Sequence, residues 1–143
     1  MIHRGSCHCG NIELEFETAI APRDATVRAC QCGFCCKHGT RAASDPEGLL
    51  TIKVREEARL NRYRFGLETA DYLICSTCGV YVAAVTRALE APRAIAIINV
   101  FENHELFSQD TIPMNYDGEN ETARLERRAE KWMPVVFKET AAS

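Results

Sequence analysis

The sequence contains no long hydrophobic run. Its longest apolar stretches are short, such as residues 94–98, and none approaches the roughly 20 residues that a membrane-spanning helix needs. The opening residues 1–4 are not followed by the apolar core of a secretory signal peptide. We therefore expect a cytoplasmic protein that has no membrane partner and keeps its thiols reduced.

Clustered positive charge is also scarce. Lys and Arg never occupy more than two consecutive positions, at Arg127 and Arg128, and the net charge is −3. Proteins that bind a nucleic-acid backbone carry Lys and Arg in a patch or stripe, so we expect no nucleic-acid partner. A length of 143 residues with 46% hydrophobic residues fits a single domain, residues 1–143, with its own core.

The hydrophobic pattern predicts a mainly β domain. Residues 12–17 alternate strictly between apolar residues and glutamate, which is typical of a strand with one buried face. Further strands are expected at residues 26–30, 50–55, 59–65, 71–75, 79–85 and 94–101. Residues 102–118 are expected to be irregular and could form a loop over the functional site.

Only the C-terminal part of the chain has a helical pattern. Acidic Glu119 and Glu121 come first and basic residues come last, which complements the helix dipole. Four residues at helical spacing predict one apolar face: Leu125, Ala129, Trp132 and Met133. We expect Pro134 to end this helix and Trp132 to anchor it to the sheet.

Cysteine, in contrast, is abundant. Eight cysteines form three groups, Cys7-His8-Cys9-Gly10, Cys30-Gln31-Cys32-Gly33-Phe34-Cys35-Cys36 and Cys75-Ser76-Thr77-Cys78-Gly79. Zinc prefers four such ligands in a tetrahedron, and short loops bring their sulfurs together. A glycine after a pair can adopt positive φ and fold the backbone back toward the sulfurs. On a strand, a C-x-C pair would point both side chains to one face.

A disulfide framework is the alternative for an even number of cysteines. It is less favoured, because a C-x-C disulfide closes a small, strained ring and because the cysteines are clustered rather than spread as staples. Eight unrelated buried thiols rank third. We therefore interpret the three groups as metal ligands.

The order of the pairs along the chain suggests two sites. Cys7 and Cys9, from a loop expected before the first strand, would combine with Cys75 and Cys78 in a closed, structural set of four sulfurs. The middle segment offers a compact set of three sulfurs, Cys30, Cys32 and Cys35. Three protein ligands and one open position are the arrangement of catalytic zinc.

Three other residues near these groups need an interpretation. Cys36 could be a small buried hydrophobe, a fourth ligand of the middle site or a redox thiol, and we rank the roles in that order. His8 and His38 could each replace a cysteine ligand. A surface or supporting role is favoured for both, because thiolates already satisfy the spacing.

The three cysteine motifs resemble those of a known family. The opening Gly5-Ser6-Cys7-His8-Cys9-Gly10, followed by an alternating strand, resembles the start of the glutathione-dependent formaldehyde-activating enzyme family, also called the CENP-V/GFA domain. The second and third groups and the tail, residues 116–118 and 132–135, are similar to it as well. The resemblance implies an Mss4-like fold of several small, strongly bent β-sheets around zinc.

The resemblance also implies a metal arrangement and an activity. It places structural zinc at Cys7, Cys9, Cys75 and Cys78, and catalytic zinc at Cys30, Cys32 and Cys35. The named enzyme of the family joins formaldehyde and glutathione to S-hydroxymethylglutathione. The expected activity is therefore that of a zinc-dependent carbon–sulfur lyase, with a small thiol such as glutathione and a small aldehyde as partners.

Two features bear on that expectation. Glutathione is anionic, and Lys37, Arg41 and Arg64 are the candidate cationic partners. Position 36 is a cysteine where family members commonly carry a larger basic or aromatic residue. The alternative function is a non-catalytic zinc module that binds a protein, and a disulfide reductase ranks third because its C-x-x-C lacks a βαβ context.

Overall fold

The computed structural model describes residues 1–139, and over these residues the chain is mainly β with one short C-terminal helix, as predicted. The strands are β1 (Ile2–Ser6), β2 (Ile12–Glu17), β3 (Arg28–Cys30), β4 (Ala42–Ala43), β5 (Leu49–Val54), β6 (Leu60–Tyr63), β7 (Asp71–Cys75), β8 (Tyr81–Thr86), β9 (Arg93–Ile97), β10 (Ile112–Met114) and β11 (Met133–Glu139). The helices are α1 (Gly33–His38) and α2 (Glu121–Lys131). Residues 140–143 of the expected domain lie outside the described residues.

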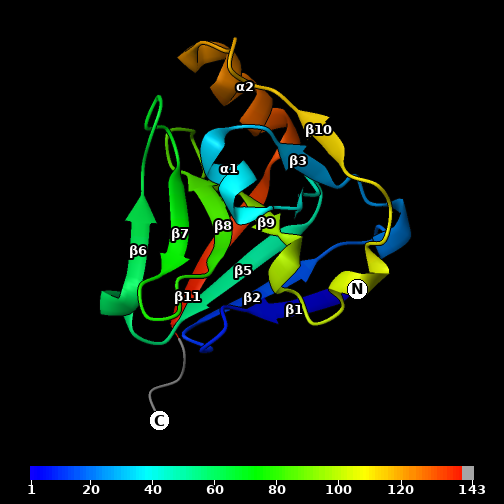
Figure 1. The fold of residues 1–143 in the computed structure, drawn as a ribbon, viewed down its shortest axis with the longest axis vertical. Coiled ribbons are helices and arrows are strands. Elements are labelled where there is room, and N and C mark those ends of the chain that lie inside the picture. Colours follow the sequence, from blue (N-terminus) through cyan, green and yellow to red (C-terminus); the bar gives the residue numbers. More distant parts are fainter. Residues whose placement is uncertain (140–143) are drawn as a thin grey trace.

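The strands form one branched and strongly bent sheet (Figure 1). One arm has the order β1-β2-β5-β11, and β9 then joins β11 to β4, β3 and β10. A second arm, β6-β7-β8, also pairs with β9. The last strand links both halves, because Met133 and Pro134 pair with β9 whereas Val135 to Glu139 run parallel to β5.

The alternating pattern of β2 explains its position. Ile12, Leu14 and Phe16 are buried in the main core, whereas the glutamates between them face outward. Lys53 of β5 lies opposite Glu13 and forms a diagonal cross-strand ion pair with Glu15 at 2.8 Å, which is compatible with this register. In contrast, β8 is buried at every position, as expected for a strand covered on both faces.

A second, smaller core cluster lies where α2 ends. It contains six buried residues, Ala42, Ala70, Tyr81, Ala84, Ile97 and Trp132. Trp132 is therefore confirmed as the anchor that fixes the end of α2 to the sheet. Phe34 of α1 and Tyr72 of β7 pack against the same cluster, which brings the middle cysteine segment next to α2.

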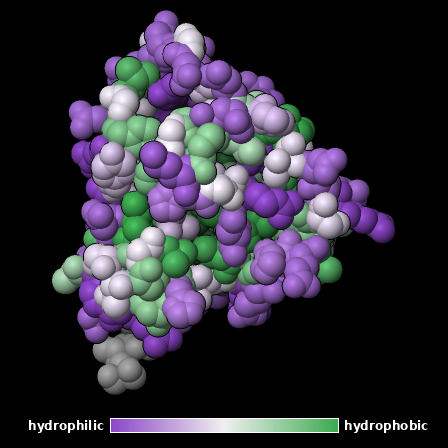
Figure 2. Space-filling model, in the orientation of Figure 1, coloured by the Kyte–Doolittle hydropathy of each residue, from purple (hydrophilic) through white to green (hydrophobic). Residues whose placement is uncertain are grey.

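Two predictions about α2 are wrong, one of them in part. Of its predicted apolar face, Trp132 and Met133 are buried but lie beyond the end of the helix, whereas Ala129 is exposed and Leu125 is half-buried. The buried residue within the helix is Arg128. The helix ends at Lys131, before Pro134, which lies in β11 and pairs with Arg93. The pairing of β11 with β5 and β9 sets this boundary. Hydrophilic side chains accordingly cover most of the tip of the molecule that α2 forms (Figure 2).

Other local differences concern short elements. Helix α1, β1 and β10 were not predicted, and residues 98–100 form a 3-10 turn rather than the end of a strand. The span 102–118 contains a 3-10 turn, His104–Leu106, in addition to β10. None of the helices within residues 1–139 is both long enough and apolar enough to cross a membrane.

Candidate metal centres

The first cysteine cluster brings together four sulfurs from two distant parts of the chain. The Sγ atoms of Cys7, Cys9, Cys75 and Cys78 all lie within 4.8 Å of one another. Cys9 Sγ lies 3.8 Å from Cys7 Sγ and 3.5 Å from Cys75 Sγ. Four ligands at a zinc–sulfur distance of about 2.3 Å would lie about 3.8 Å apart, so this set fits a tetrahedral zinc ion.

Two tight turns build this four-sulfur cluster. The Gly10 amide donates to the Cys7 carbonyl, and the Gly79 amide donates to the Cys75 carbonyl at 2.8 Å. Both glycines have the predicted positive φ, +85° and +77°, which an L side chain rarely adopts. Because β1 precedes Cys7, the first turn connects β1 to β2, and the predicted position before the first strand is wrong. The Cys7–Cys9 pair therefore lies in a turn and not on a strand.

Hydrogen bonds to sulfur complete the first cluster. The Ile12 amide donates to Cys7 Sγ at 3.3 Å, and the Arg59 guanidinium donates to Cys9 Sγ at 3.3 Å. Burial raises the pKa of Cys7 to about 11. Burial would also raise that of Cys78, but backbone amides, including that of Cys9, lower this pKa to about 6. Since metal ligands are thiolates, metal binding here releases protons.

The second cluster is local. Cys30 ends β3, Cys32 caps the start of α1 and Cys35 lies inside that helix, and their sulfurs lie within 4.8 Å of one another. The Cys35 amide donates to Cys32 Sγ at 3.4 Å, which fixes the turn into α1. Gly39, with φ +59°, ends the helix. This three-sulfur cluster matches the predicted set.

The three sulfurs differ in their affinity for a proton. A hydrogen bond from Cys35, assisted by the positive charge of Arg127, lowers the pKa of Cys30 to about 6. The same contact with Cys30, together with burial, raises the pKa of Cys35. Without metal, the first proton of this cluster therefore leaves from Cys30.

Cys36 and the histidines lie outside both clusters. Cys36 is exposed, so its predicted role as a small buried hydrophobe is wrong, and its Sγ lies 4.0 Å from the Cys30 carbonyl oxygen. His8 and His38 are exposed, and His38 packs its ring on Phe34. All eight cysteines, which lie within the described residues, are free, so the disulfide alternative is not supported.

Two cavities border the three-sulfur cluster. The first, of about 570 Å³, is lined by Cys30, Cys35 and Cys36 together with residues 104–105 and 107–111. The predicted loop over the site is thus confirmed as one wall of this cavity. The second cavity, of about 350 Å³, is lined by Cys30 and Cys32 on one side. Its other walls contain three aromatic residues, Phe65, Tyr72 and Tyr116, and three arginines, Arg124, Arg127 and Arg128.

A solved structure is similar to this chain over most of its length. It is a crystal structure of a Rhodobacter sphaeroides protein that is 32% identical in sequence, with a TM-score of 0.59. The match covers 77% of this chain and 97% of that chain. The chain belongs to the same family as this Rhodobacter sphaeroides protein. A scan against protein-family models and a search of curated proteins gave no match.

The three candidate cationic residues lie in different surroundings. Arg41 lines the first cavity, where its guanidinium donates to the carbonyls of Phe107 and Gln109. Arg64 instead forms an ion pair with buried Asp71 at 2.5 Å, and Lys37 lines neither cavity. Only one of the three candidates is therefore next to the three-sulfur cluster.

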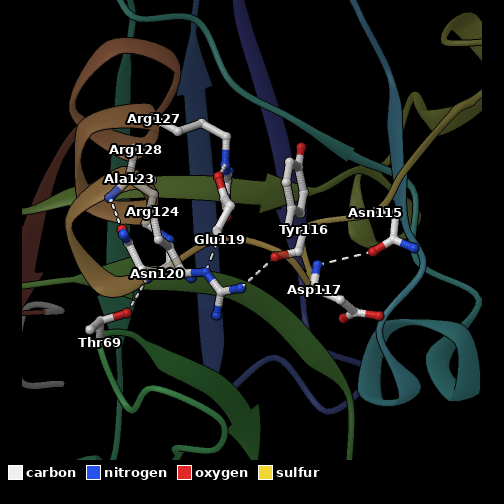
Figure 3. Close-up of polar contacts among 10 residues, drawn as sticks. All are labelled: Thr69, Asn115, Tyr116, Asp117, Glu119, Asn120, Ala123, Arg124, Arg127 and Arg128. Carbon is white, nitrogen blue, oxygen red and sulfur yellow. Dashed lines mark hydrogen bonds and ion pairs between the residues drawn. The ribbon is translucent and has the colours of Figure 1, made fainter.

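The arginines of α2 were missed as site residues. Their helical spacing was the available signal, but it was interpreted only as a complement to the helix dipole. Figure 3 shows Arg124 and Arg127 beside Glu119, whose carboxylate accepts from Arg127 at 2.7 and 3.0 Å and from Arg124 at 3.2 Å. Arg128 instead donates to Thr69. The Arg127 guanidinium also stacks on Tyr116, with Cζ 3.6 Å from the ring centroid.

Proposed function

We propose that the protein is a zinc-dependent enzyme of the carbon–sulfur lyase type that handles an adduct of a thiol and an aldehyde. Glutathione and formaldehyde, the substrates implied by the family resemblance, are the first pair to test. The observation that carries this proposal is the three-sulfur cluster between two cavities. A set of three protein ligands beside solvent-filled space leaves a position for a substrate atom.

The donor set supports zinc as the metal. Both clusters consist of cysteine sulfurs alone, and soft thiolate ligands favour zinc over magnesium or calcium. Zinc held by Cys30, Cys32 and Cys35 would supply a Lewis acid that polarises a carbonyl or lowers the pKa of a thiol. Free thiols in both clusters also fit a reducing, cytoplasmic location.

The proposed reaction is a balanced addition. The sulfur of the thiol attacks the carbonyl carbon, a carbon–sulfur bond forms, and the π electron pair moves to the carbonyl oxygen. The proton lost by the thiol ends on that oxygen, and the reverse reaction breaks the same bond. Because Cys30 lines both cavities, each cavity can hold one reactant next to the same cluster.

The residues of the chain would act mainly by positioning. Residues 104–105 and 107–111 form one wall of the first cavity, on one side of the cluster. Helix α2 covers the other side through Arg124, Arg127 and Arg128. Holding two reactants in a fixed orientation replaces a bimolecular encounter by an effectively unimolecular step, which is a large part of catalysis in such additions.

A second candidate function is a zinc-binding module that binds a protein and has no catalytic role. A group of exposed and half-buried rings on β6 and α1 favours it. Tyr63 is 45% exposed, and its ring centroid lies 5.6 Å from that of Phe34 and 5.5 Å from that of Phe65. Aromatic residues are enriched at protein interfaces.

Exchange-sensitive NMR of formaldehyde and glutathione distinguishes the two functions. We expect zinc-loaded wild-type protein to speed formation of the hemithioacetal above the spontaneous rate, and Cys35→Ser to abolish the gain. Lys37→Gln, a change at an exposed position of α1 that lines neither cavity, should retain it. A wild-type rate that never exceeds the spontaneous one, across several thiols and aldehydes, would favour the binding module. A gain that survives Cys35→Ser would place any catalysis elsewhere.

A further inference from the structure

The wall of the second cavity contains a buried arginine without a counter-charge. Arg128 is only 4% exposed, and among residues 1–139 no carboxylate lies within ion-pair distance of it. One terminal nitrogen donates to Thr69 Oγ1 at 2.7 Å, but the buried Nε has no hydrogen-bond partner. Its guanidinium lies over Trp132, with Cζ 4.6 Å from the ring centroid. A buried charge with an unsatisfied donor costs free energy unless a ligand pairs with it.

The other arginines of this wall are already paired. Arg124 and Arg127 share the carboxylate of Glu119, and Asp117 is the second acidic residue that lines the cavity. Burial lowers the pKa of Arg128, yet a guanidinium stays protonated near neutral pH. Arg128 is thus the positive group in this cavity that most lacks an anion.

The shape of the cavity limits the ligand. Its volume of about 350 Å³ lies at the low end for small-molecule sites. Phe65, Leu67 and Tyr72 form an apolar wall beside the arginines. A guanidinium presents N–H donors in a planar fork, which matches the two oxygens of a planar carboxylate.

We propose that the second cavity binds a small organic anion through its carboxylate. Arg128 would be the main partner of the carboxylate, and the apolar wall would contact the apolar part of the anion. Cys30 and Cys32 line the same cavity, so the far end of such a ligand would reach the three-sulfur cluster. The identification of this anion as the thiol or aldehyde substrate rests on the proposed function.

Titration of zinc-loaded wild-type protein with sodium benzoate tests the site directly. The probe combines a carboxylate with a planar apolar ring, and benzamide is its uncharged counterpart. We expect the Nε–H resonance of Arg128 to shift in a saturable manner with benzoate and to remain unchanged with benzamide. Equal shifts with both compounds, or none with either, would overturn the proposal. Tighter binding of phenylphosphonate than of benzoate would keep an anion site but overturn the carboxylate assignment.

Variants of α2 test the role of Arg128. Arg128→Gln should weaken benzoate binding by at least about tenfold, as expected for the loss of a charged hydrogen-bonding partner. Arg128→Lys, which keeps the positive charge but not the planar set of N–H donors, should retain part of the benzoate affinity. Lys131→Gln removes a positive charge from an exposed position of the same helix that does not line the cavity, and it should bind like wild type.

Anion binding at Arg128 and lyase activity can be tested separately. If Arg128→Gln lowers zinc affinity while benzoate affinity is unchanged, Arg128 only balances the thiolates and the proposal fails. If Arg128→Gln does not fold, Arg128→Lys and the wild-type titration, in which the Arg128 Nε–H resonance itself reports the contact, still decide it. Benzoate binding needs no turnover, so an inactive protein that binds benzoate would refute the lyase activity alone.

Discussion

The two cysteine clusters use the same ligand atom, but the chain encloses them differently. Around the four-sulfur cluster, two turns contribute all the ligands, and amides and Arg59 hydrogen-bond to the sulfurs. Around the three-sulfur cluster, cavities open on two sides, and arginines of α2 form the far wall. The surroundings, more than the ligand type, would therefore separate a structural metal centre from a reactive one.

The clusters also differ in what they connect. The first joins Cys9 to Cys75, 66 residues apart, and therefore links the β1–β2 turn to the end of β7. The second spans only residues 30–35 and fixes the entry into α1. Metal binding to the first closes a long loop of chain, so its loss should affect the whole domain.

The largest effect is expected from a ligand of the four-sulfur cluster. Cys78→Ser should release zinc and lower the free energy of unfolding by roughly several kcal/mol, because the binding free energy of a structural zinc ion contributes to the stability of the fold. Thermal unfolding followed by circular dichroism, with a zinc assay, measures both. A variant that melts like wild type with its zinc retained would show that Cys78 is no ligand, and Cys36→Ser is the matched control.

Mild chelation should separate the clusters. The three-sulfur cluster has fewer ligands and two adjoining cavities, so we expect its zinc to leave first while the circular dichroism spectrum stays unchanged. Zinc release followed with a coloured chelator, alongside the spectrum, gives the order. Loss of both ions in one unfolding event would remove the distinction between a structural and an exchangeable centre.

Sequence reasoning predicted the parts of the molecule that depend on local patterns. The period of two in residues 12–17 gave β2 with its exact bounds, and residues 71–75 coincide with β7. Both cysteine sets are brought together as expected, because their spacing and their turn glycines, such as Gly79, already restrict the backbone. The same reasoning failed where tertiary contacts decide the outcome.

Two of the failures have this physical cause, and the third has a local one. Pro134 was interpreted as the end of a helix, but pairing of β11 with β9 and β5 places it in a strand. Arg128 is buried against Trp132 and Thr69, contacts that no helical pattern reveals. Helix α1, only six residues long, is too short for a periodic signal and depends on the cap at Cys32.

A smaller effect should come from the charge network beside the three-sulfur cluster. Glu119→Gln removes charged hydrogen bonds to Arg124 and Arg127, so we expect it to lower the free energy of unfolding by about 1–2 kcal/mol at pH 7. The hydrogen bond from Arg127 is the main reason why the pKa of Glu119 lies below its usual value. Exposed Glu121→Gln is the matched control.

The sign of the pH dependence follows from that lowered pKa. The contribution of Glu119 is present above the carboxyl pKa of the unfolded chain, about 4.3, and is lost as the pH falls through the lower pKa of the folded state. Urea unfolding at several pH values should show the gap between wild type and Glu119→Gln closing below about pH 4. A gap that is independent of pH would mean that Glu119 stabilises α2 without its charge.

The smallest effect is expected at Cys36, which tests whether the second cluster is truly open. Its side chain is exposed and its sulfur contacts the Cys30 carbonyl at 4.0 Å, whereas the three clustered sulfurs lie within 4.8 Å of one another. Cobalt-substituted Cys36→Ser should therefore keep the metal content and absorption spectrum of wild type, while Cys35→Ser should lose sulfur-to-cobalt charge-transfer intensity. If Cys36→Ser loses that intensity too, Cys36 closes the shell, both clusters become four-sulfur sites, and the contrast on which the proposed activity rests disappears.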